Sequence, residues 1–214
     1  KIFGKSCFEY SAEHTFTIEL ENGITEFALG FFKDEDKIEK TSMWDFGKVL
    51  IDAKESWKTY WQKGGAADFS LCKDPRAFEL ERRIVLSQYL TAVHSAGSLP
   101  PQETGLMCNS WYGKFHLEMH FLHSAHFALW GRSELLERSL GWYFDILEKA
   151  KANAARNGFK GARWPKMTSY EGWDSPSYIA TLLIWQQPHL IYMLDLLRTS
   201  KQADERDEFT KEYW

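Results

Sequence analysis

The sequence has little of what marks most specialised protein classes. Its three cysteines, Cys7, Cys72 and Cys108, are too few and too scattered for a disulfide framework or a zinc knuckle. It has no Lys/Arg cluster and a net charge of −4, so the basic face that binds phosphates is missing and we expect no nucleic-acid partner. No run approaches about 18 apolar residues, which excludes a membrane-spanning helix. A Ser-His-Asp order, a glycine-rich phosphate loop and a Cys-x-x-Cys pair are also absent.

Aromatic residues, in contrast, are abundant. They make up 16% of the 214 residues, with ten tryptophans, in a chain that is otherwise of ordinary globular composition. Trp and Tyr join an apolar ring to a polar atom, which suits both large helical cores and the stacking surfaces of sugar-binding sites. The composition alone leaves both interpretations open.

Residues 6–32 read as β-strands. Apolar and polar residues alternate over 15–20, which is the period of a half-buried strand. The turn residues Glu21-Asn22-Gly23 follow, and a second apolar run covers 24–31. The pattern therefore predicts a β-hairpin made of these two runs.

A charged and polar stretch, 33–41, follows the strands and predicts a linker. We interpret 1–40 as the end of a β-domain with its linker, and 41–214 as a helical domain. The chain starts at Lys1 without a signal-peptide pattern, and we expect it to be a piece of a longer protein.

The period then changes to that of helices. The pattern predicts helices over 42–62, 75–97, 114–130, 133–157 and 177–200, and a further one from Ala203. Ser42 and Asp45 resemble a capping box, and Asp74 followed by Pro75 is typical of a helix start. Pro188 is expected to disturb the helix that contains it.

Two long connections, 97–113 and 158–177, precede the third and fifth predicted helices. Loops of this length are uncommon in compact domains and are often functional. If consecutive helices are antiparallel, both loops fall at the same end of the helical domain, and together they are rich in tryptophan. This end is the first candidate for a site.

The segment from Trp111 to His123 has the densest mixture of polar and aromatic residues. Lys114 and Glu118 are four apart, so a helix would place them on one face, with Trp111 about one turn earlier. An aromatic ring beside a carboxylate and an amine suits a polyhydroxylated ligand, because the ring stacks on a sugar while the charges bind its hydroxyls. The alternative is a solvated Lys–Glu pair and a core tryptophan.

Three histidines in the same segment, His116, His120 and His123, follow an i, i+4, i+7 spacing. Such a row can offer imidazoles to a metal, but Glu118 does not stand where the zinc-protease motif has its glutamate. Histidines in helix–helix interfaces show the same spacing. We therefore expect packing residues and no metal.

Two further segments offer polar side chains. The turn Gly161-Ala-Arg-Trp-Pro165 is followed by Glu171 and Asp174, which are either a general acid and base or solvated loop carboxylates. The segment Trp185-Gln-Gln-Pro-His189 places two amides and an imidazole in a predicted apolar helix. Buried amides need partners, so these residues either join helices or contact a ligand.

The motifs resemble those of the six-hairpin glycosidases. The segment from Glu103 to Glu118, with its Trp-Tyr-Gly-Lys-Phe-His-Leu run, is similar to the segment that opens the pocket of maltose- and kojibiose-type phosphorylases. Gly113 matches a motif glycine, Lys114 falls on the motif histidine, and Glu118 falls on the sugar-binding aspartate.

Other parts of the chain extend the resemblance. Gly161-Ala-Arg-Trp-Pro165 is similar to a phosphorylase turn, and His189 to a histidine on the helix after it. The inverting α-L-fucosidases have a related asparagine-rich stretch, onto which fall Lys114, His116, Glu118, Met119 and His120.

The resemblance implies a mainly α fold, an incomplete (α/α) toroid, preceded by a hairpin from an upstream β-sandwich. It makes 41–214 the first half of the toroid and implies a periplasmic or secreted glycoside hydrolase, acting on an oligo- or polysaccharide by inversion and needing no cofactor. In that chemistry one carboxylic acid protonates the leaving oxygen and a second carboxylate activates water. The general acid is expected beyond Trp214, in the remainder of the protein, which is also the partner of this part.

The expected sugar-binding residues are Trp111, Lys114, His116, Glu118, His120, Arg163, Trp164, Gln187 and His189. The alternative is a non-catalytic carbohydrate-binding or helical scaffold protein that has kept the pocket and lost the catalytic carboxylates.

Overall fold

The computed structural model describes residues 2–3, 6–12, 15–20, 28–29, 46–106, 108–175, 179 and 182–213. The chain divides into two units, Lys1–Gln62 and Lys63–Trp214, which we describe separately.

The first unit has short antiparallel strands and one helix: β1 (Ile2–Phe3), β2 (Ser6–Ala12), β3 (Thr15–Leu20), β4 (Ala28–Leu29) and α1 (Phe46–Gln62). Strand β2 pairs with β3 and strand β1 with β4. The register places Phe8 opposite Ile18 and Tyr10 opposite Phe16, with an irregularity between Tyr10 and Ala12.

The strand predicted at 15–20 is confirmed, but its predicted partner is wrong. Its partner is β2, which precedes it, whereas the run 24–31 contributes only the two-residue strand β4 to the described structure. Both neighbouring segments carry apolar residues at alternate positions, so the period of two fits either pairing. The predicted turn at 21–23 lies outside the described residues.

Helix α1 matches the predicted helix from Phe46 onward, while its predicted caps, Ser42 and Asp45, lie outside the described residues. Lys48 and Asp52 form an i, i+4 ion pair of 2.7 Å on its exposed surface. The rings of Trp57, Tyr60 and Trp61 contact one another near its end.

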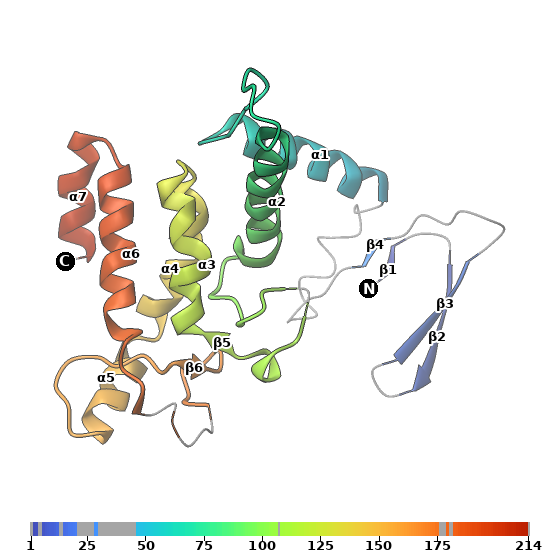
Figure 1. The fold of residues 1–214 in the computed structure, drawn as a ribbon. Helices are drawn as coiled ribbons and strands as arrows, with labels where there is room; N and C mark the ends of the chain where they lie inside the picture. Colours follow the sequence, from blue (N-terminus) through green and yellow to red (C-terminus); the bar gives the residue numbers. More distant parts are fainter. Residues whose placement is uncertain are drawn as a thin grey trace. The chain divides into compact units, whose positions relative to one another are not determined.

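The second unit is mainly helical, as predicted. Its elements are α2 (Ala77–Ser95), the 3₁₀ turn η3 (Trp111–Gly113), β5 (Phe115–His116), α3 (Leu117–Leu129), α4 (Ser133–Asp145), α5 (Leu147–Arg156), β6 (Met167–Thr168), α6 (Gln187–Ser200) and α7 (Ala203–Tyr213). Helix α3 packs against α4 and α6, and α4 also packs against α6. Figure 1 shows that α3 and α6 run in the same direction while α7 returns beside α6. None of the described helices is long and apolar enough to cross a membrane.

The core lies between α3, α4 and α6. Phe127, Leu136 and Met193, one from each helix, have no more than traces of exposed surface. Burying a side chain of this size stabilises the fold by about 1.5–3 kcal/mol. The other buried apolar residues of this cluster are Leu117, Leu140, Trp142, Tyr143, Leu190, Leu194, Leu197 and Phe209.

Two predicted helices need correction. The helix predicted over 133–157 is two helices, α4 and α5, separated at Ile146, whose backbone is not helical (φ −102°, ψ 15°). The helix predicted over 177–200 begins at Gln187 in the described structure. Pro188 therefore lies in the first turn of α6, where its missing N–H is not needed, and does not disturb the helix.

Two other helix starts are shifted. The helix predicted over 114–130 begins at Leu117, because Phe115–His116 first pairs with β6 as an extended strand. Pro75 lies in a turn, and α2 begins two residues later at Ala77. At these two positions the predicted helix start is therefore right to within one turn of the helix.

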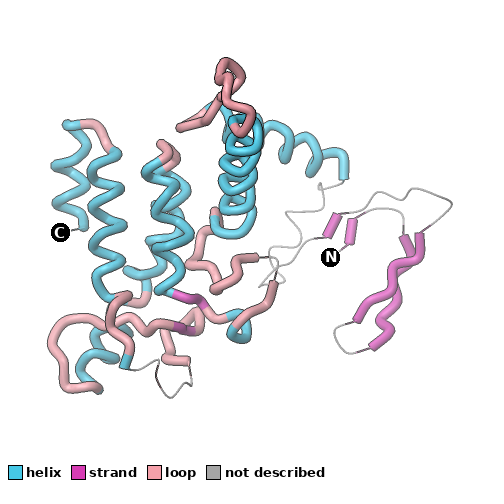
Figure 2. Tube along the Cα trace, in the orientation of Figure 1, coloured by secondary structure: helices cyan, strands magenta, loops and turns pink. Residues whose placement is uncertain are grey.

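The two long loops do lie at the same end of this unit, as predicted. The strands β5 and β6 pair directly, with Phe115 opposite Thr168 and His116 opposite Met167. The Leu117 amide also donates to the Lys166 carbonyl at 2.8 Å. Figure 2 shows both loops gathered around these two short strands, below α3 and α6.

Candidate functional site

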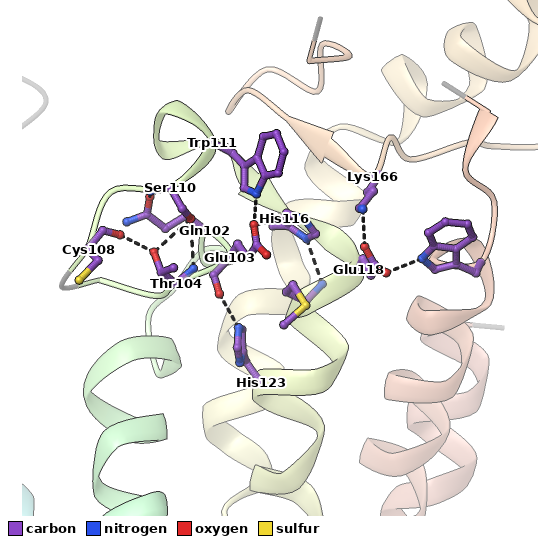
Figure 3. Close-up of polar contacts among 12 residues, drawn as sticks. Gln102, Glu103, Thr104, Cys108, Ser110, Trp111, His116, Glu118, His123 and Lys166 are labelled. Carbon is purple, nitrogen blue, oxygen red and sulfur yellow. Dashed lines mark hydrogen bonds and ion pairs between the residues drawn. The ribbon is translucent and has the colours of Figure 1, made fainter. Parts of the chain in front are cut away.

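Glu118 stands in the first turn of α3, where three segments distant in the sequence meet. The Lys166 Nζ lies 2.8 Å from its carboxylate, and the Trp185 Nε1 donates to the other oxygen at 2.7 Å. Lys166 directly precedes β6 and Trp185 lies two residues before α6 (Figure 3). The Glu118 side chain keeps 24% of its surface exposed, so a ligand can still reach the carboxylate.

The surroundings of Glu118 favour the ionised form. Burial raises the pKa of this carboxyl, but the hydrogen bonds from Lys166 and Trp185 outweigh burial and hold the pKa below its ordinary value. The N-terminal end of α3 adds a favourable partial positive charge. Glu118 is therefore a hydrogen-bond acceptor with a fixed orientation.

The predicted partner of Glu118, Lys114, is wrong. Lys114 precedes β5 with an extended backbone (φ −66°, ψ 145°), so it does not share a helix face with Glu118. Lys166 supplies the amine instead, from the second long loop. Lys166 directly follows the turn 161–165, and Trp185 opens the segment 185–189. Both segments were singled out in the sequence, but neither pattern indicated a contact with Glu118.

His116 lies beside Glu118 and caps the helix. Its Nδ1 accepts a hydrogen bond from the Met119 amide at 3.2 Å, and its side chain is only 3% exposed. Its Nε2 lies 4.0 Å from the Glu103 carboxylate. Burial lowers the pKa of His116, although the negative charge of Glu103 opposes this effect. His116 is thus a neutral imidazole at neutral pH, and Glu103 is a carboxylate that the sequence did not single out.

Trp111 extends the site toward the first long loop. Its indole Nε1 donates to the Glu103 carboxylate, and 52% of the residue is exposed. Figure 3 shows Trp111, Glu103, His116 and Glu118 following one another across the end of α3. Trp111 does not lie one turn earlier on the same helix as Glu118, as predicted, but in the 3₁₀ turn η3, with Glu103 and His116 between it and Glu118.

His120 must be removed from the predicted sugar-binding set. It has no exposed surface, and its ring nitrogens lie 3.0 Å from the Tyr143 hydroxyl and 2.8 Å from Ser139 Oγ. Ser139 donates its own proton to the Leu136 carbonyl, so the His120 Nε2 donates to Ser139 and Tyr143 donates to Nδ1. Burial lowers the pKa of His120 to about 3. Its role is to join α3 to α4.

His116, which precedes α3, and His120 and His123 within α3 have different partners. His116 faces Glu103, His120 is enclosed by α4, and the His123 Nε2 donates to the Glu103 carbonyl at 2.7 Å. Within the described ranges, no group of three or more His, Cys, Asp or Glu side chains is arranged to hold a metal ion. The three side chains thus serve separate contacts, although they follow a regular spacing along the chain.

Trp164 and Gln187 connect the second long loop to α6. The Trp164 amide donates to the Gln187 side-chain oxygen at 3.1 Å, and the Gln187 side-chain nitrogen donates back to the Trp164 carbonyl at 2.6 Å. The Trp164 indole donates to the Tyr143 carbonyl on α4 at 3.2 Å. Of the two alternatives for the amides, Gln187 thus joins elements of the fold, and it does so at the start of α6.

Arg163 and Asp174 also stabilise this loop. Arg163 is buried, and its guanidinium lies 3.7 Å from the Asp174 carboxylate, which also accepts a 3.0 Å hydrogen bond from Arg156. Asp174 is thus engaged by two guanidinium groups, so its contacts favour a structural role over that of a general acid. Glu171, its suggested partner, is exposed.

His189 lies in the first turn of α6 and stacks on the Phe121 ring of α3, with centroids 4.7 Å apart. Burial lowers the pKa of His189, while a hydrogen bond to the Leu117 carbonyl and the charge of Glu118 oppose this effect. Its Nδ1 is buried without a hydrogen-bond partner. His189 therefore presents a neutral imidazole near Glu118.

The two long loops and the segment before α6 carry several tryptophan and tyrosine side chains that are about half exposed or more: Trp111, Tyr112, Tyr170, Trp173 and Trp185. Of these, Trp111 and Trp185 are linked by contacts to Glu118, and together with Glu118, Lys166, Glu103 and His116 they form what we call the loop-end site. An ionised carboxylate, an amine and exposed rings can bind hydroxyl groups and apolar ring faces at once.

Comparisons of the chain with protein-family models, curated proteins and solved structures found no match.

Proposed function

We propose that the loop-end site binds carbohydrate, as the substrate-binding part of a glycoside hydrolase that acts on an oligo- or polysaccharide. The observation that carries this proposal is the Glu118 carboxylate, which is ionised, partly exposed and held between Lys166 and Trp185. A carboxylate fixed in this way accepts hydrogen bonds from sugar hydroxyls without first having to be ordered.

The surrounding groups suit the rest of a sugar ring. Lys166 can donate to a hydroxyl from the other side of Glu118, and the half-exposed rings of Trp111 and Trp185 can cover apolar C–H faces. A hydrogen bond to a charged group contributes about 1.5–3 kcal/mol, so Glu118 would account for a large part of a weak binding energy.

The packing of the second unit supports a toroidal fold for this enzyme. Helices α3 and α6 are parallel neighbours, and α4 between them in sequence packs against both. Helix pairs repeated in this way place alternate helices in an inner and an outer layer, as in an (α/α) toroid. We accordingly interpret 41–214 as the first half of such a toroid, following a β-sandwich, in a periplasmic or secreted protein.

The proposed reaction is hydrolysis by inversion, with the proton donor supplied by another part of the enzyme. Glu118 does not fit that role, because a general acid at neutral pH needs a raised pKa and the contacts of Glu118 lower it. This property also favours a second candidate function, a carbohydrate-binding module without catalysis.

Binding measurements test the proposal directly. The chain is titrated calorimetrically with gluco-, xylo-, manno- and galacto-oligosaccharides, and reducing ends released from the same sugars are measured in parallel. We expect at least one series to bind, and Glu118→Gln to weaken that binding by about ten- to a hundredfold.

Glu134→Gln is the matched control, since Glu134 stands in the first turn of α4 and pairs with Lys63 at 2.8 Å. Unchanged binding by Glu118→Gln would contradict the proposed site. Because the proposed proton donor lies in another part of the enzyme, we expect this chain to bind sugar without releasing reducing ends. Release of reducing ends by this chain would contradict that placement of the proton donor.

A further inference from the structure

The turn η3 has an unusual backbone. Trp111, Tyr112 and Gly113 follow one another with φ values of 48°, 58° and 70°. Glycine tolerates this left-handed region, but a side chain with a Cβ does so only at an energetic cost, and two aromatic residues in succession are exceptional. The turn is therefore strained at Trp111 and Tyr112, and only its last position is occupied by a glycine, Gly113.

The surrounding loop holds this turn in place with several hydrogen bonds. The Gly113 amide donates to the Ser110 carbonyl and the Lys114 amide to the Trp111 carbonyl. The Ser110 amide donates to the Gln102 side chain, and the Thr104 amide donates to Ser110 Oγ. The conformation is thus imposed by partners on both sides of the turn.

Core packing does not compensate for the energetic cost of this strained backbone. Tyr112 is 91% exposed and Trp111 is about half exposed, so neither ring is buried against the core of the second unit. Backbone strain that the surrounding structure maintains is concentrated at functional sites, where it prearranges groups for a ligand. Here the groups that it displays are two exposed aromatic side chains that are adjacent in the sequence.

The turn is also connected to Glu118. The Trp111 indole donates to Glu103, whose carboxylate faces the His116 Nε2, and His116 immediately precedes α3 (Figure 3). A ligand bound at Glu118 therefore has the turn as its neighbour on the side of the first long loop.

We propose that Trp111 and Tyr112 form a preformed aromatic platform for a second sugar ring, next to the ring that Glu118 binds. This inference rests on the proposed function and makes it specific. The ligand is an oligosaccharide of at least two pyranose units, and the platform discriminates it from a monosaccharide. Because the turn is already in its binding conformation, the second ring gains contact without an ordering cost.

The test is the dependence of affinity on ligand length. Calorimetric titrations use monomers to hexamers of the sugar series that the wild-type chain binds. Tyr112→Gly removes the ring and relieves the strain together, so it is expected to lower the affinity for dimers and longer oligomers about tenfold while leaving monomer affinity unchanged. Its melting temperature should not fall, because glycine adopts a left-handed backbone freely.

Two matched variants separate the ring from the backbone. Tyr112→Phe keeps the ring and should retain the length dependence. Phe159→Ala removes another aromatic side chain, 62% exposed on the other long loop, and should leave all affinities unchanged.

The outcomes distinguish the two hypotheses. If Glu118→Gln loses affinity and Tyr112→Gly keeps the affinity for oligomers, the platform is wrong and the proposed function stands. An equal loss for monomers and oligomers in Tyr112→Gly, or a lower melting temperature, would show a structural turn and overturn the platform. If no sugar of the panel binds to the wild-type chain, both proposals fall.

Discussion

The helical unit has two ends, and the connections between the helices differ from one end to the other. At one end two connections between helices are short: α3 passes to α4 through Gly131, and α6 to α7 through Lys201 and Gln202. There the backbones touch, with the Gly65 amide 2.6 Å from the Trp130 carbonyl. At the other end two long loops bring polar and aromatic side chains together around β5 and β6. The short end therefore maintains the fold, and the side chains of the loop end are available for binding a ligand.

The largest expected effect comes from the short end. A Cβ added at Gly64 would lie 2.4 Å from the Trp130 carbonyl oxygen, and its φ is +81°. Gly64→Ala should therefore lower the free energy of unfolding by about 2–4 kcal/mol, measured by urea denaturation. Carbohydrate affinity should not change while the protein is folded.

Gly158→Ala is the matched control for that experiment. Gly158 has a similar φ of +77° but no atom near the added Cβ, so the loss should be limited to about 1–2 kcal/mol. Equal effects at the two positions would contradict the close backbone approach at the short end.

A smaller effect on the free energy of unfolding is expected when the pH is lowered. The folded pKa of His120 is about 3, below its unfolded value near 6.5, so the unfolded chain binds the proton first as the pH falls. The free energy of unfolding should therefore drop by about 2 kcal/mol between pH 6.5 and 5 from this residue alone. Urea denaturation at several pH values measures it, and His120→Gln should flatten the dependence. If the free energy of unfolding of the wild-type chain is constant between pH 6.5 and 5, then His120 is not a buried, neutral imidazole.

The loop end is tested by replacing each of the two candidate amines in turn with glutamine. Lys166→Gln should raise the pKa of Glu118, because the opposite charge that holds it down is gone, and should weaken carbohydrate binding several-fold. Lys114→Gln should change both much less. The Glu118 carboxyl can be titrated by NMR in each variant, and a larger shift for Lys114→Gln would restore the partner predicted from the sequence.

The smallest effect is expected from Glu134→Gln at the short end. Its ion pair with Lys63 is about half exposed, and such pairs contribute less than about 0.5 kcal/mol. Neither the unfolding energy nor the affinity should change measurably. A loss of affinity would mean that the short end takes part in binding and would break the comparison between the ends.

The sequence predicted those parts of this arrangement that depend on local rules. Helical periodicity located the helices of the second unit, and the antiparallel rule placed both long loops at one end. Glu118 was also expected at that end. These features follow from spacing along the chain, which a sequence displays directly.

The errors share a physical cause. Lys114 was chosen for Glu118 because it stands four residues away, but pairing of His116 with the distant Met167 delays the helix and brings in Lys166 instead. His120 stands between His116 and His123 in a regular row of histidines, and only the packing of α4 shows that it is enclosed. Contacts between residues far apart in the chain have no periodic signature, so they become visible only in the structure.

The pairing of β5 and β6 also sets how this end opens. It is two residues long, yet the His116 amide donates to the Pro101 carbonyl on one loop and the Leu117 amide to the Lys166 carbonyl on the other. Neither loop can detach without breaking a bond that orders its counterpart, so the two should fluctuate as one cooperative unit. The amide protons of His116 and Leu117 should then exchange with solvent at similar rates, and a bound ligand should slow both together.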